Sequence, residues 1–308
     1  MDLRICIEEY LKTCSRRSNL SGKTVKAYRL DLEQFERMAR TQNVERINKS
    51  DIETYVSELQ AVRKPASIRR KIAALRVFFR FVEDEYGVEN PFARTRFKIR
   101  EPSPLPKTIP LYKIETLLSA IYEKLFSNKK ESKRYGELLR DVTALELLFA
   151  TGVRVSELCG LTARNIDLAE GVIQIRGKGG GMRVVHVCNP SVLQLLTDYF
   201  LRFSKPIART GFFFINRIGS PLLPSSVRAM LRRRAKEAGI GLHVTPHMFR
   251  HSFATLLLEA DVDIRYIQQF LGHRSITTTQ IYTHVTSAKQ RSILSEKHPR
   301  NKLNIKTE

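Results

Sequence analysis

No apolar run in this chain of 308 residues approaches 18 residues, the length that a membrane-spanning helix needs. The first ten residues, M-D-L-R-I-C-I-E-E-Y, carry acidic side chains where a secretory signal peptide carries basic ones. These absences argue against a membrane protein and against a secreted one. We therefore expect a soluble, cytoplasmic protein with no membrane partner.

Cysteine is also scarce, and no two cysteines form a C-x-x-C pair. Each lies in an apolar stretch, which is typical of buried free thiols in a reducing compartment. The four are Cys6, Cys14, Cys159 and Cys188. His247 and His251 have the spacing of a metal pair, but the Glu of H-E-x-x-H and a third ligand are lacking. Gly179 follows Lys178 where a P-loop needs Ser or Thr. We expect no disulfide, metal, nucleotide or other cofactor.

Acidic residues are few relative to basic ones. The chain has 31 Asp and Glu against 53 Lys and Arg, a formal net charge of +22, and the basic residues are spread along its whole length. A solvated surface, or attachment to a membrane surface, would also tolerate this charge. We favour a wide DNA footprint, because neutralised phosphates release counterions and so drive binding.

The N-terminal part of the chain has the spacing of amphipathic helices. Predicted helices cover residues 2–15, residues 21–40, a third stretch from a capping box at Ser50–Glu53 to Gln60, and a fourth from Pro65. The pattern breaks after Asn90-Pro91, because residues 94–110 combine five basic side chains with four prolines. We therefore predict a helical N-terminal domain at 1–92, a basic proline-rich linker at 93–110 and a second domain at 111–308.

The second domain mixes helices with a few strands. Strands at 172–176 and 183–188 should form a hairpin around the glycine-rich 177–181, and 212–215 should be a short edge strand. Helices are expected at 112–126, from the end of a charged insertion at 127–136 to Thr151, at 191–203, at 224–238 and as a tail at 287–296. The predicted fold class is mainly α with a small antiparallel β-sheet.

The stretch from Thr245 to Val285 has the marks of a functional cassette. Thr245 is a good N-cap, and Pro246 suits the first helical position. His247 and Arg250 are three residues apart and share a face, whereas Phe249, Phe253, Leu256 and Leu257 should be buried on the opposite stripe. The N-terminus of this helix presents free N–H groups and positive dipole charge, which suit a phosphate.

Several motifs together resemble those of the tyrosine recombinases, the phage integrase and Xer family. They are H-x-x-R at 247–250, L-G-H at 271–273, I-Y-T-H at 281–284, A-T-G-V-R-V-S-E-L-C-G-L at 150–161 and G-K-G at 177–179. Each motif alone is weak, but their order over half the chain is specific. The resemblance implies a two-domain DNA clamp, in which a helical core-binding domain precedes an α/β catalytic domain. It also implies site-specific recombination through a 3′-phosphotyrosine intermediate.

The resemblance assigns a role to each matching residue. Tyr282 would be the nucleophile, since a tyrosine hydroxyl can attack a phosphodiester and store its bond energy. Arg154 and Arg250 would fork onto oxygens of the scissile phosphate, which Lys cannot copy. His273 would donate a hydrogen bond to the phosphate, and His247 would help to accept the tyrosine proton. Taken singly, a packing tyrosine or a surface arginine would be the ordinary interpretation of these residues.

Other candidates are less specific. Lys178 resembles the hairpin lysine that acts as general acid to the leaving 5′ oxygen, although a plain basic hairpin would look the same. Met182 departs from commoner family versions, which carry a further Lys or Glu there. Glu157 could hold the Arg154 guanidinium or a histidine in place, or serve only as a helix-start charge. His251 and His284 compete with the chosen histidines, and His251 is expected to form hydrogen bonds inside the core.

The resemblance also implies partners. They are double-stranded DNA with an inverted-repeat core site and three further protomers, of the same or a second recombinase, assembled on two sites with a Holliday junction intermediate. An accessory protein or translocase would fit the same scheme. The tail helix is a candidate for docking on a neighbouring protomer or for packing on its own chain. Dimer resolution is the favoured role, and integration of a mobile element, a relaxing topoisomerase-like enzyme and an inactive DNA-binding relative are the alternatives.

Overall fold

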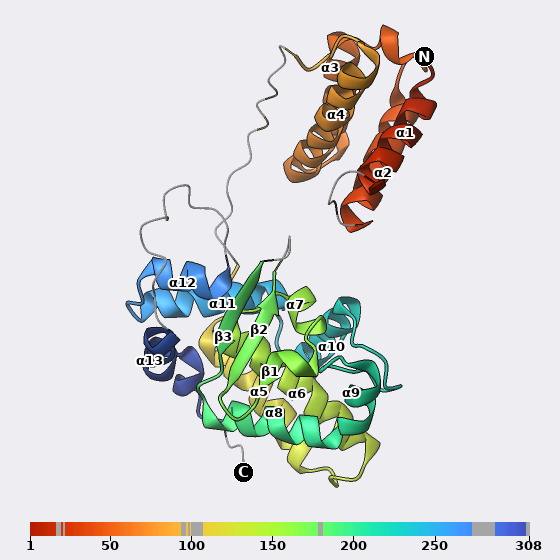
Figure 1. The fold of residues 1–308 in the computed structure, drawn as a ribbon. Coiled ribbons are helices and arrows are strands. Elements are labelled where there is room, and N and C mark those ends of the chain that lie inside the picture. Colours follow the sequence, from red (N-terminus) through yellow and green to blue (C-terminus); the bar gives the residue numbers. More distant parts are fainter. Residues whose placement is uncertain are drawn as a thin grey trace. The chain divides into compact units, whose positions relative to one another are not determined.

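The computed structural model describes residues 1–16, 20, 22–93, 97, 99, 107–177, 181–272 and 287–305, with the backbone alone at 287–290. The chain divides into two compact units, Met1–Pro104 and Leu105–Glu308, each with its own hydrophobic core (Figure 1). The fold class is the predicted one, since helices dominate and a small antiparallel sheet is present.

The first unit consists of helices. They are α1 (Leu3–Arg16), α2 (Gly22–Met38), the short 3₁₀ helix η1 (Val44–Arg46), α3 (Lys49–Val62) and α4 (Pro65–Tyr86). α4 starts with proline at its first position and ends at Gly87, whose φ of 65° allows the left-handed cap. Phe35 of α2 and Phe78 and Phe79 of α4 are buried together, so the apolar stripes of the helices make one core.

The capping box of α3 differs from the prediction. The N-cap is Asn48, whose side chain accepts hydrogen bonds from the N–H groups of Ser50 and Asp51, and Asp51 accepts one from the Asn48 N–H. The predicted box at Ser50–Glu53 is therefore wrong. Asn is as good an N-cap as Ser, and an Asp at the third position closes the box as Glu does.

The second unit combines helices with a three-stranded sheet. Its elements in chain order are α5 (Leu111–Phe126), α6 (Lys133–Thr151), α7 (Val155–Cys159), η2 (Ala163–Asn165), β1 (Ile166–Asp167), β2 (Val172–Arg176), β3 (Met182–His186), α8 (Pro190–Arg202), α9 (Ser204–Thr210), α10 (Pro224–Glu237), α11 (Pro246–Glu259), α12 (Ile264–Leu271), α13 (Ser287–Lys297) and η3 (Pro299–Lys302). The strand order is β1-β2-β3, all antiparallel, and β2 pairs with β3 from Val172↔His186 to Arg176↔Met182.

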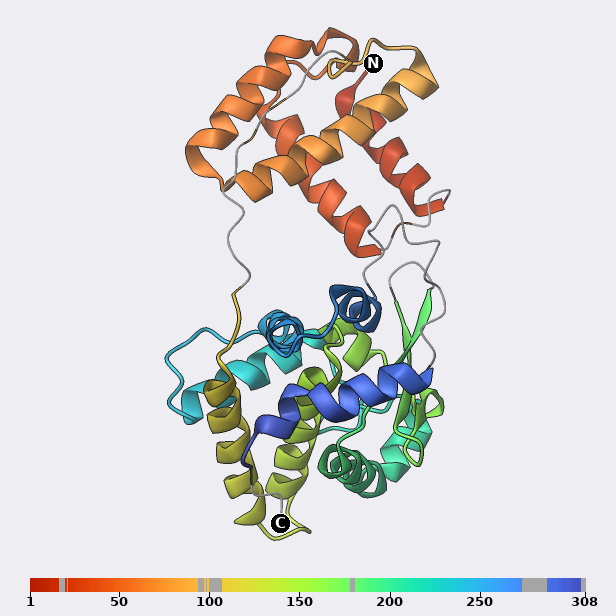
Figure 2. The ribbon, with the colours of Figure 1, turned by 90° about the vertical axis from the view of Figure 1, so that its left-hand side faces the viewer.

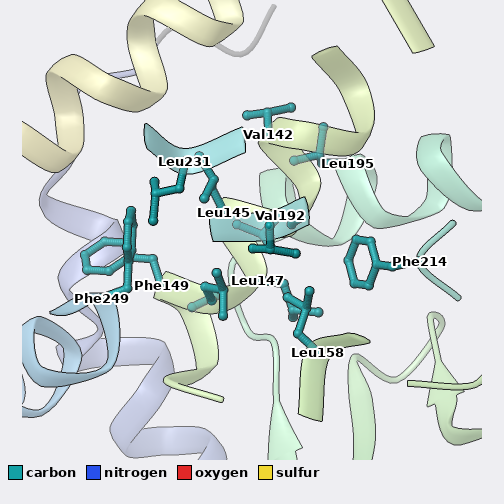
Figure 3. Close-up of a cluster of buried hydrophobic side chains, with 14 of the residues drawn as sticks. Val142, Leu145, Leu147, Phe149, Leu158, Val192, Leu195, Phe214, Leu231 and Phe249 are labelled. Carbon is teal, nitrogen blue, oxygen red and sulfur yellow. The ribbon is translucent and has the colours of Figure 1, made fainter. Parts of the chain in front are cut away.

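Helix α6 forms the centre of this unit. Every residue from Asp141 to Thr151 is buried, and α5, α8 and α11 pack around it. Figure 3 shows Val142, Leu145, Leu147 and Phe149 of α6 surrounded by side chains of the neighbouring elements. A helix that is buried on all sides in this way fixes the positions of the elements that contact it.

Two local predictions in this unit are corrected. α6 begins at Lys133, inside the predicted insertion 127–136, because Ser132 caps it by accepting from the Tyr135 N–H. The expected edge strand at 212–215 is not a strand: Phe212 and Ile215 form only isolated bridges, with Thr162 and Pro221. Phe213, Phe214 and Ile215 are buried in the core, so the apolar run reflects burial and not pairing.

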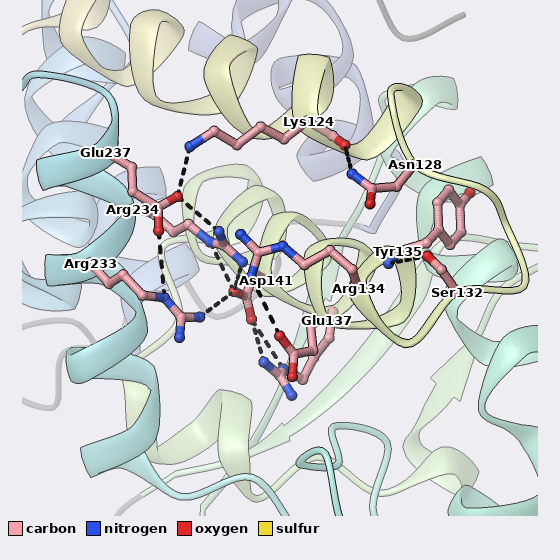
Figure 4. A network of polar contacts seen from close by, with 11 residues as sticks. Lys124, Asn128, Ser132, Arg134, Tyr135, Glu137, Asp141, Arg233, Arg234 and Glu237 are labelled. Carbon is pink, nitrogen blue, oxygen red and sulfur yellow. Dashed lines mark hydrogen bonds and ion pairs between the residues drawn. The ribbon is translucent and has the colours of Figure 1, made fainter.

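Polar contacts join α6 to α10. The carboxylate of Asp141 is fully buried and accepts hydrogen bonds from Arg140, Arg233 and Arg234, and Arg234 also donates to Glu237 (Figure 4). A buried carboxylate is tolerated only when its charge is paired. This network therefore holds the two helices in one register.

The C-terminal segment packs on its own chain. α13 lies against β3 (Figure 2). Its Leu294 is buried with Phe253 of α11 and Phe270 of α12. Beyond α13, His298 contacts the Ala150 carbonyl at 2.6 Å, and Arg300 donates to the buried Glu146 of α6. Burial lowers the pKa of His298 to about 4, so this ring is neutral.

The four cysteines are free thiols, and Cys188 is only half-buried, unlike the others. Within the described residues, no helix combines the length and the apolar character that crossing a bilayer requires.

Leu145→Ala should destabilise the second unit, because Leu145 is fully buried at the centre of α6. We expect a loss of about 2–5 kcal/mol in the free energy of unfolding, measured by denaturant titration. Leu201→Ala is the matched control, since this leucine of α8 is 65% exposed and its truncation should cost less than about 0.5 kcal/mol. Equal effects of the two substitutions would contradict the assigned core.

Candidate active site

Helix α11 positions the first group of predicted site residues. Thr245 accepts a hydrogen bond from the Met248 N–H, and Pro246 occupies the first turn as predicted. His247 is exposed, whereas Arg250 is only 4% exposed. The ring of His251, which was expected to bond inside the core, is half-buried and lies edge-on against the His247 ring, with centroids 4.6 Å apart.

Two backbone carbonyls hold the Arg250 guanidinium. Its Nη1 donates to the Gly152 carbonyl at 2.8 Å, and its Nη2 donates to the Leu271 carbonyl at 2.6 Å. Burial lowers the pKa of Arg250 to about 10, and the positive charge of Arg154 adds to this effect while Glu157 opposes it. Arg250 therefore stays charged at neutral pH, although neutral oxygens are its direct partners.

Gly152 makes the junction that brings these elements together. It ends α6 with a φ of 62°, in the left-handed region that favours glycine. A Cβ at this position would lie 2.6 Å from the Phe253 ring and 2.9 Å from the Leu271 side chain. Only glycine allows α6, α11 and α12 to approach this closely, and Arg154 follows two residues later.

Glu157 fixes Arg154 at the start of α7. The Glu157 Oε2 accepts from the Arg154 backbone N–H at 2.8 Å, and Oε1 accepts from the Arg154 Nη1, also at 2.8 Å. The side chain of Arg154 is 36% exposed, whereas that of Glu157 is 5% exposed. The guanidinium is thus anchored on one side and open to solvent on the other. Glu157 has the anchoring contact that the sequence suggested for it.

Arg183 completes the network from strand β3. Its Nη1 and Nη2 donate to the two Glu157 oxygens at 3.0 and 2.8 Å, and its Nε donates to the Phe270 carbonyl at 3.1 Å. Sequence reasoning did not select this residue. The signal was present, because alternation along β3 places position 183 on the same face as the buried Val185, where a charge needs a partner.

The C-terminal end of α12 lies against this cluster. Its last two carbonyls, of Phe270 and Leu271, accept from Arg183 and Arg250, which suits the negative end of a helix dipole. Gly272 ends the helix with a φ of 62°, and a Cβ there would meet the Arg183 side chain at 2.8 Å. Two arginines from different elements therefore set where the chain leaves α12.

Four side chains thus form what we call the arginine cluster: Arg154, Arg183, Arg250 and Glu157. Three guanidinium groups face one carboxylate, a formal charge of three minus one, or plus two. An excess of fixed positive charge in a partly buried place suits an anion such as a phosphate.

Three predicted site residues, Lys178, His273 and Tyr282, lie outside the described residues. The described neighbours are Gly177, whose N–H bonds the Gly181 carbonyl at 2.7 Å at the end of the hairpin, and Gly272. Within the described ranges, no group of three His, Cys, Asp or Glu side chains is placed to hold a metal ion.

The effect of Glu157→Gln on thermal stability should depend on pH, because the substitution removes the ionised carboxylate of the arginine cluster. Burial raises the pKa of Glu157, but hydrogen bonds from Arg183 and from the Arg154 backbone outweigh it and lower the pKa to about 2. An unfolded Glu titrates near about 4.3, so the ionised group stabilises the folded chain above that pH and this stabilisation is lost as pH falls towards 2. We expect the variant to melt below wild type at pH 7 and the difference to shrink between about pH 5 and 3.

Exposed Glu131→Gln is the control, and its melting temperature should follow wild type throughout. Thermal melts at each pH decide the matter. A difference between Glu157→Gln and wild type that is independent of pH would contradict the ion-pair geometry.

Comparison with known proteins follows the same division of the chain. The family model described as "Phage integrase family" matches residues 115–289, and the "Phage integrase, N-terminal SAM-like domain" matches residues 7–86. A tyrosine recombinase of Agathobacter rectalis is 46% identical over 97% of this chain and 98% of its own. Tyrosine recombinase XerC of Oceanobacillus iheyensis is 34% identical over 97% of both chains.

A solved structure has the same fold. The XerH site-specific recombinase bound to its difH substrate aligns with a TM-score of 0.66 and 23% identity, over 94% of this chain and 83% of that one. Since the integrase model spans more than half of the chain and the relatives match over nearly all of it, the protein belongs to the phage integrase family of tyrosine recombinases and is a Xer-like site-specific recombinase.

Proposed function

We propose that this recombinase cleaves and rejoins DNA through a 3′-phosphotyrosine intermediate, with the arginine cluster as its phosphate site. The observation that carries the proposal is the convergence of Arg154, the N-cap of α7, and Arg250 of α11 beside one buried carboxylate. Nearly a hundred residues separate them in the sequence. A family motif alone does not require such convergence, whereas a scissile phosphate does.

The proposed reaction conserves bond energy. The Tyr282 oxygen attacks the scissile phosphorus, an O–P bond forms, and the bond to the 5′ oxygen breaks. His247 helps to take the phenolic proton, and Lys178 protonates the leaving 5′ oxygen. The reverse attack by a 5′ hydroxyl rejoins the strands. Since the phosphotyrosine stores the energy of the broken bond, we propose that no metal, nucleotide or other cofactor is needed.

The two arginines have complementary roles in this proposal. A guanidinium carries five N–H donors, and Arg250 uses two on carbonyls, so further donors remain for phosphate oxygens. Because its partners are uncharged, its positive charge is not cancelled locally. Arg154 is anchored by Glu157 and open to solvent, which suits a fork onto the same phosphate. His273 would donate to the remaining oxygen.

Duplex DNA is the proposed substrate. Helix α10 exposes a basic face made of Arg228, Arg232, Arg233 and Lys236, while Val227 and Leu231 are buried. The chain's net charge of +22 also favours binding to the phosphates of DNA. Among its structural neighbours, XerH is bound to difH DNA, and lambda integrase forms a tetramer on a Holliday junction. We propose that this chain also acts on an inverted-repeat core site, and that four protomers, of one or two recombinases, assemble on two such sites.

The N-terminal domain at 1–92 is proposed to bind the core site, and the basic linker at 93–110 to follow the DNA backbone. The match of residues 7–86 to the integrase SAM-like domain supports this division. A tail helix that packs on its own chain through Leu294 would have to be released to dock on a neighbouring protomer. Chromosome or plasmid dimer resolution is the biological role that we favour, with or without an accessory protein or translocase.

Tyr282→Phe should bind DNA but form no covalent adduct. The test uses a duplex that the wild-type chain selects from a random-sequence library, with a nick beside the cleavage point to trap the intermediate. A denaturing gel measures the adduct, and Tyr112→Phe, which alters an exposed tyrosine of α5, should leave it unchanged. Undiminished adduct from Tyr282→Phe would show that another residue is the nucleophile.

Arg250→Ala and Arg250→Lys should each slow cleavage of the same duplex by at least about a hundredfold at saturating protein. A lysine keeps the charge but cannot reach two carbonyls and a phosphate together. The equilibrium dissociation constant should change little, because many other basic residues contact the duplex. Thermal melting identifies any unfolded variant. Weaker binding with an unchanged cleavage rate would make Arg250 an ordinary phosphate contact.

A further inference from the structure

On the basis of the recombinase function proposed above, we propose that Arg183 is a positioning residue of the phosphate site. Its guanidinium holds the Glu157 carboxylate, which in turn holds Arg154, while its Nε–H holds the end of α12 beside the carbonyl that holds Arg250. Arg183 would thus set the distance between the two phosphate-binding arginines without touching the DNA.

The hydrogen-bond acceptor positions of the Glu157 carboxylate are all occupied. Its Oε1 accepts from Nη1 of Arg154 and Nη1 of Arg183, and its Oε2 accepts from the Arg154 backbone N–H and Nη2 of Arg183. An ionised carboxylate has about four acceptor sites, so these four bonds use all of them. The carboxylate cannot turn without losing a charge-assisted hydrogen bond, and its orientation fixes the Arg154 guanidinium.

Glu157 and an incoming phosphate compete for the Arg154 guanidinium. In the absence of the Arg183 fork, Glu157 would be left with one cationic partner and two vacant acceptor positions. A carboxylate in that state pairs with both nitrogens of a single arginine. Arg154 would then turn towards Glu157 and away from an incoming phosphate. Arg183 therefore keeps Glu157 occupied, so that Arg154 is held at one nitrogen and presents the remainder of its guanidinium to solvent.

Arg183 also links the arginine cluster to the end of α12. Arg183 and Arg250 bond adjacent carbonyls, of Phe270 and Leu271, and the Arg183 side chain packs on Gly272. One residue thus joins three elements that are far apart in the sequence: it belongs to β3, bonds α7 and bonds the end of α12. An arginine fork suits this arrangement because its planar donors have fixed directions, and lysine has no such geometry.

The test is the single-turnover cleavage rate of Arg183→Lys on the selected, nicked duplex at saturating protein. We expect a loss of about tenfold or more, with a dissociation constant within about threefold of wild type. Arg140→Lys is the matched control: the Arg140 side chain is 12% exposed against 13% for Arg183, and it also donates two N–H groups to a buried carboxylate. The control should lose stability but keep the cleavage rate.

A double-mutant cycle with Glu157→Gln tests whether Arg183 acts through Glu157. The combined variant should lose far less than the product of the two single losses, because both remove the same support. A second probe is a duplex with a neutral methylphosphonate at the scissile position. On this duplex the ratio of the wild-type rate to the Arg183→Lys rate should be smaller. A methylphosphonate lacks the negative charge of the phosphate, so its cleavage depends less on correctly placed arginines.

Wild-type cleavage by Arg183→Lys, an equal rate loss in Arg140→Lys, or fully multiplicative losses in the cycle would overturn the proposal. A further readout does not depend on catalysis. The Arg154 guanidinium is held at one nitrogen in wild type and in Arg140→Lys, but Glu157 can bind two of its nitrogens in Arg183→Lys, so its ¹⁵N signals should show slower rotation in that variant. If wild type forms no adduct, the proposed function fails, and these signals alone decide whether Arg183 positions Arg154.

Discussion

The Glu157 carboxylate, bonded by two arginines beside a third, is the interaction on which the arginine cluster depends. Three guanidinium groups repel one another, and a single buried carboxylate offsets part of that repulsion at a cost in desolvation. Arg250 is held by carbonyls instead, so the cluster keeps an excess of positive charge. A site that binds a phosphate needs such an excess, and a purely structural network would be better neutralised.

The Asp141 network shows the contrast. The Asp141 carboxylate bonds three arginines, whereas Glu157 bonds two, and Glu237 supplies a second negative charge that pairs with Arg234 and Lys124. That network joins α6 to α10, and each of its arginines bonds a carboxylate. In the arginine cluster, Arg250 bonds two backbone carbonyls instead of a carboxylate. The first arrangement suits a structural role, and the second suits the binding of an anion.

Backbone shape matters as much as charge. Gly152 and Gly272 both adopt left-handed conformations, and a Cβ at either would collide with neighbouring side chains. They allow α6, α11 and α12 to meet where the Gly152 and Leu271 carbonyls can accept from Arg250. The buried C-terminal part of α6, Asp141–Thr151, fixes this junction, so packing in the core controls the geometry of the site.

Local pattern and motif order were enough to predict the fold class, the family and most helices, because helix periodicity, proline at helix starts and the order of functional motifs are properties of neighbouring residues. The predicted capping box and edge strand were wrong, since a good N-cap two residues earlier and burial of the 212–215 stretch are decided by competition and packing. The proposed roles of Arg154 and Arg250 came from the motifs. The sequence also suggested that Glu157 could hold Arg154. The bonds of Arg183 with Glu157 and with the end of α12 came only from the tertiary structure, because a fork that joins β3, α7 and α12 depends on side-chain directions across 26 and 87 positions of sequence, which no local pattern encodes.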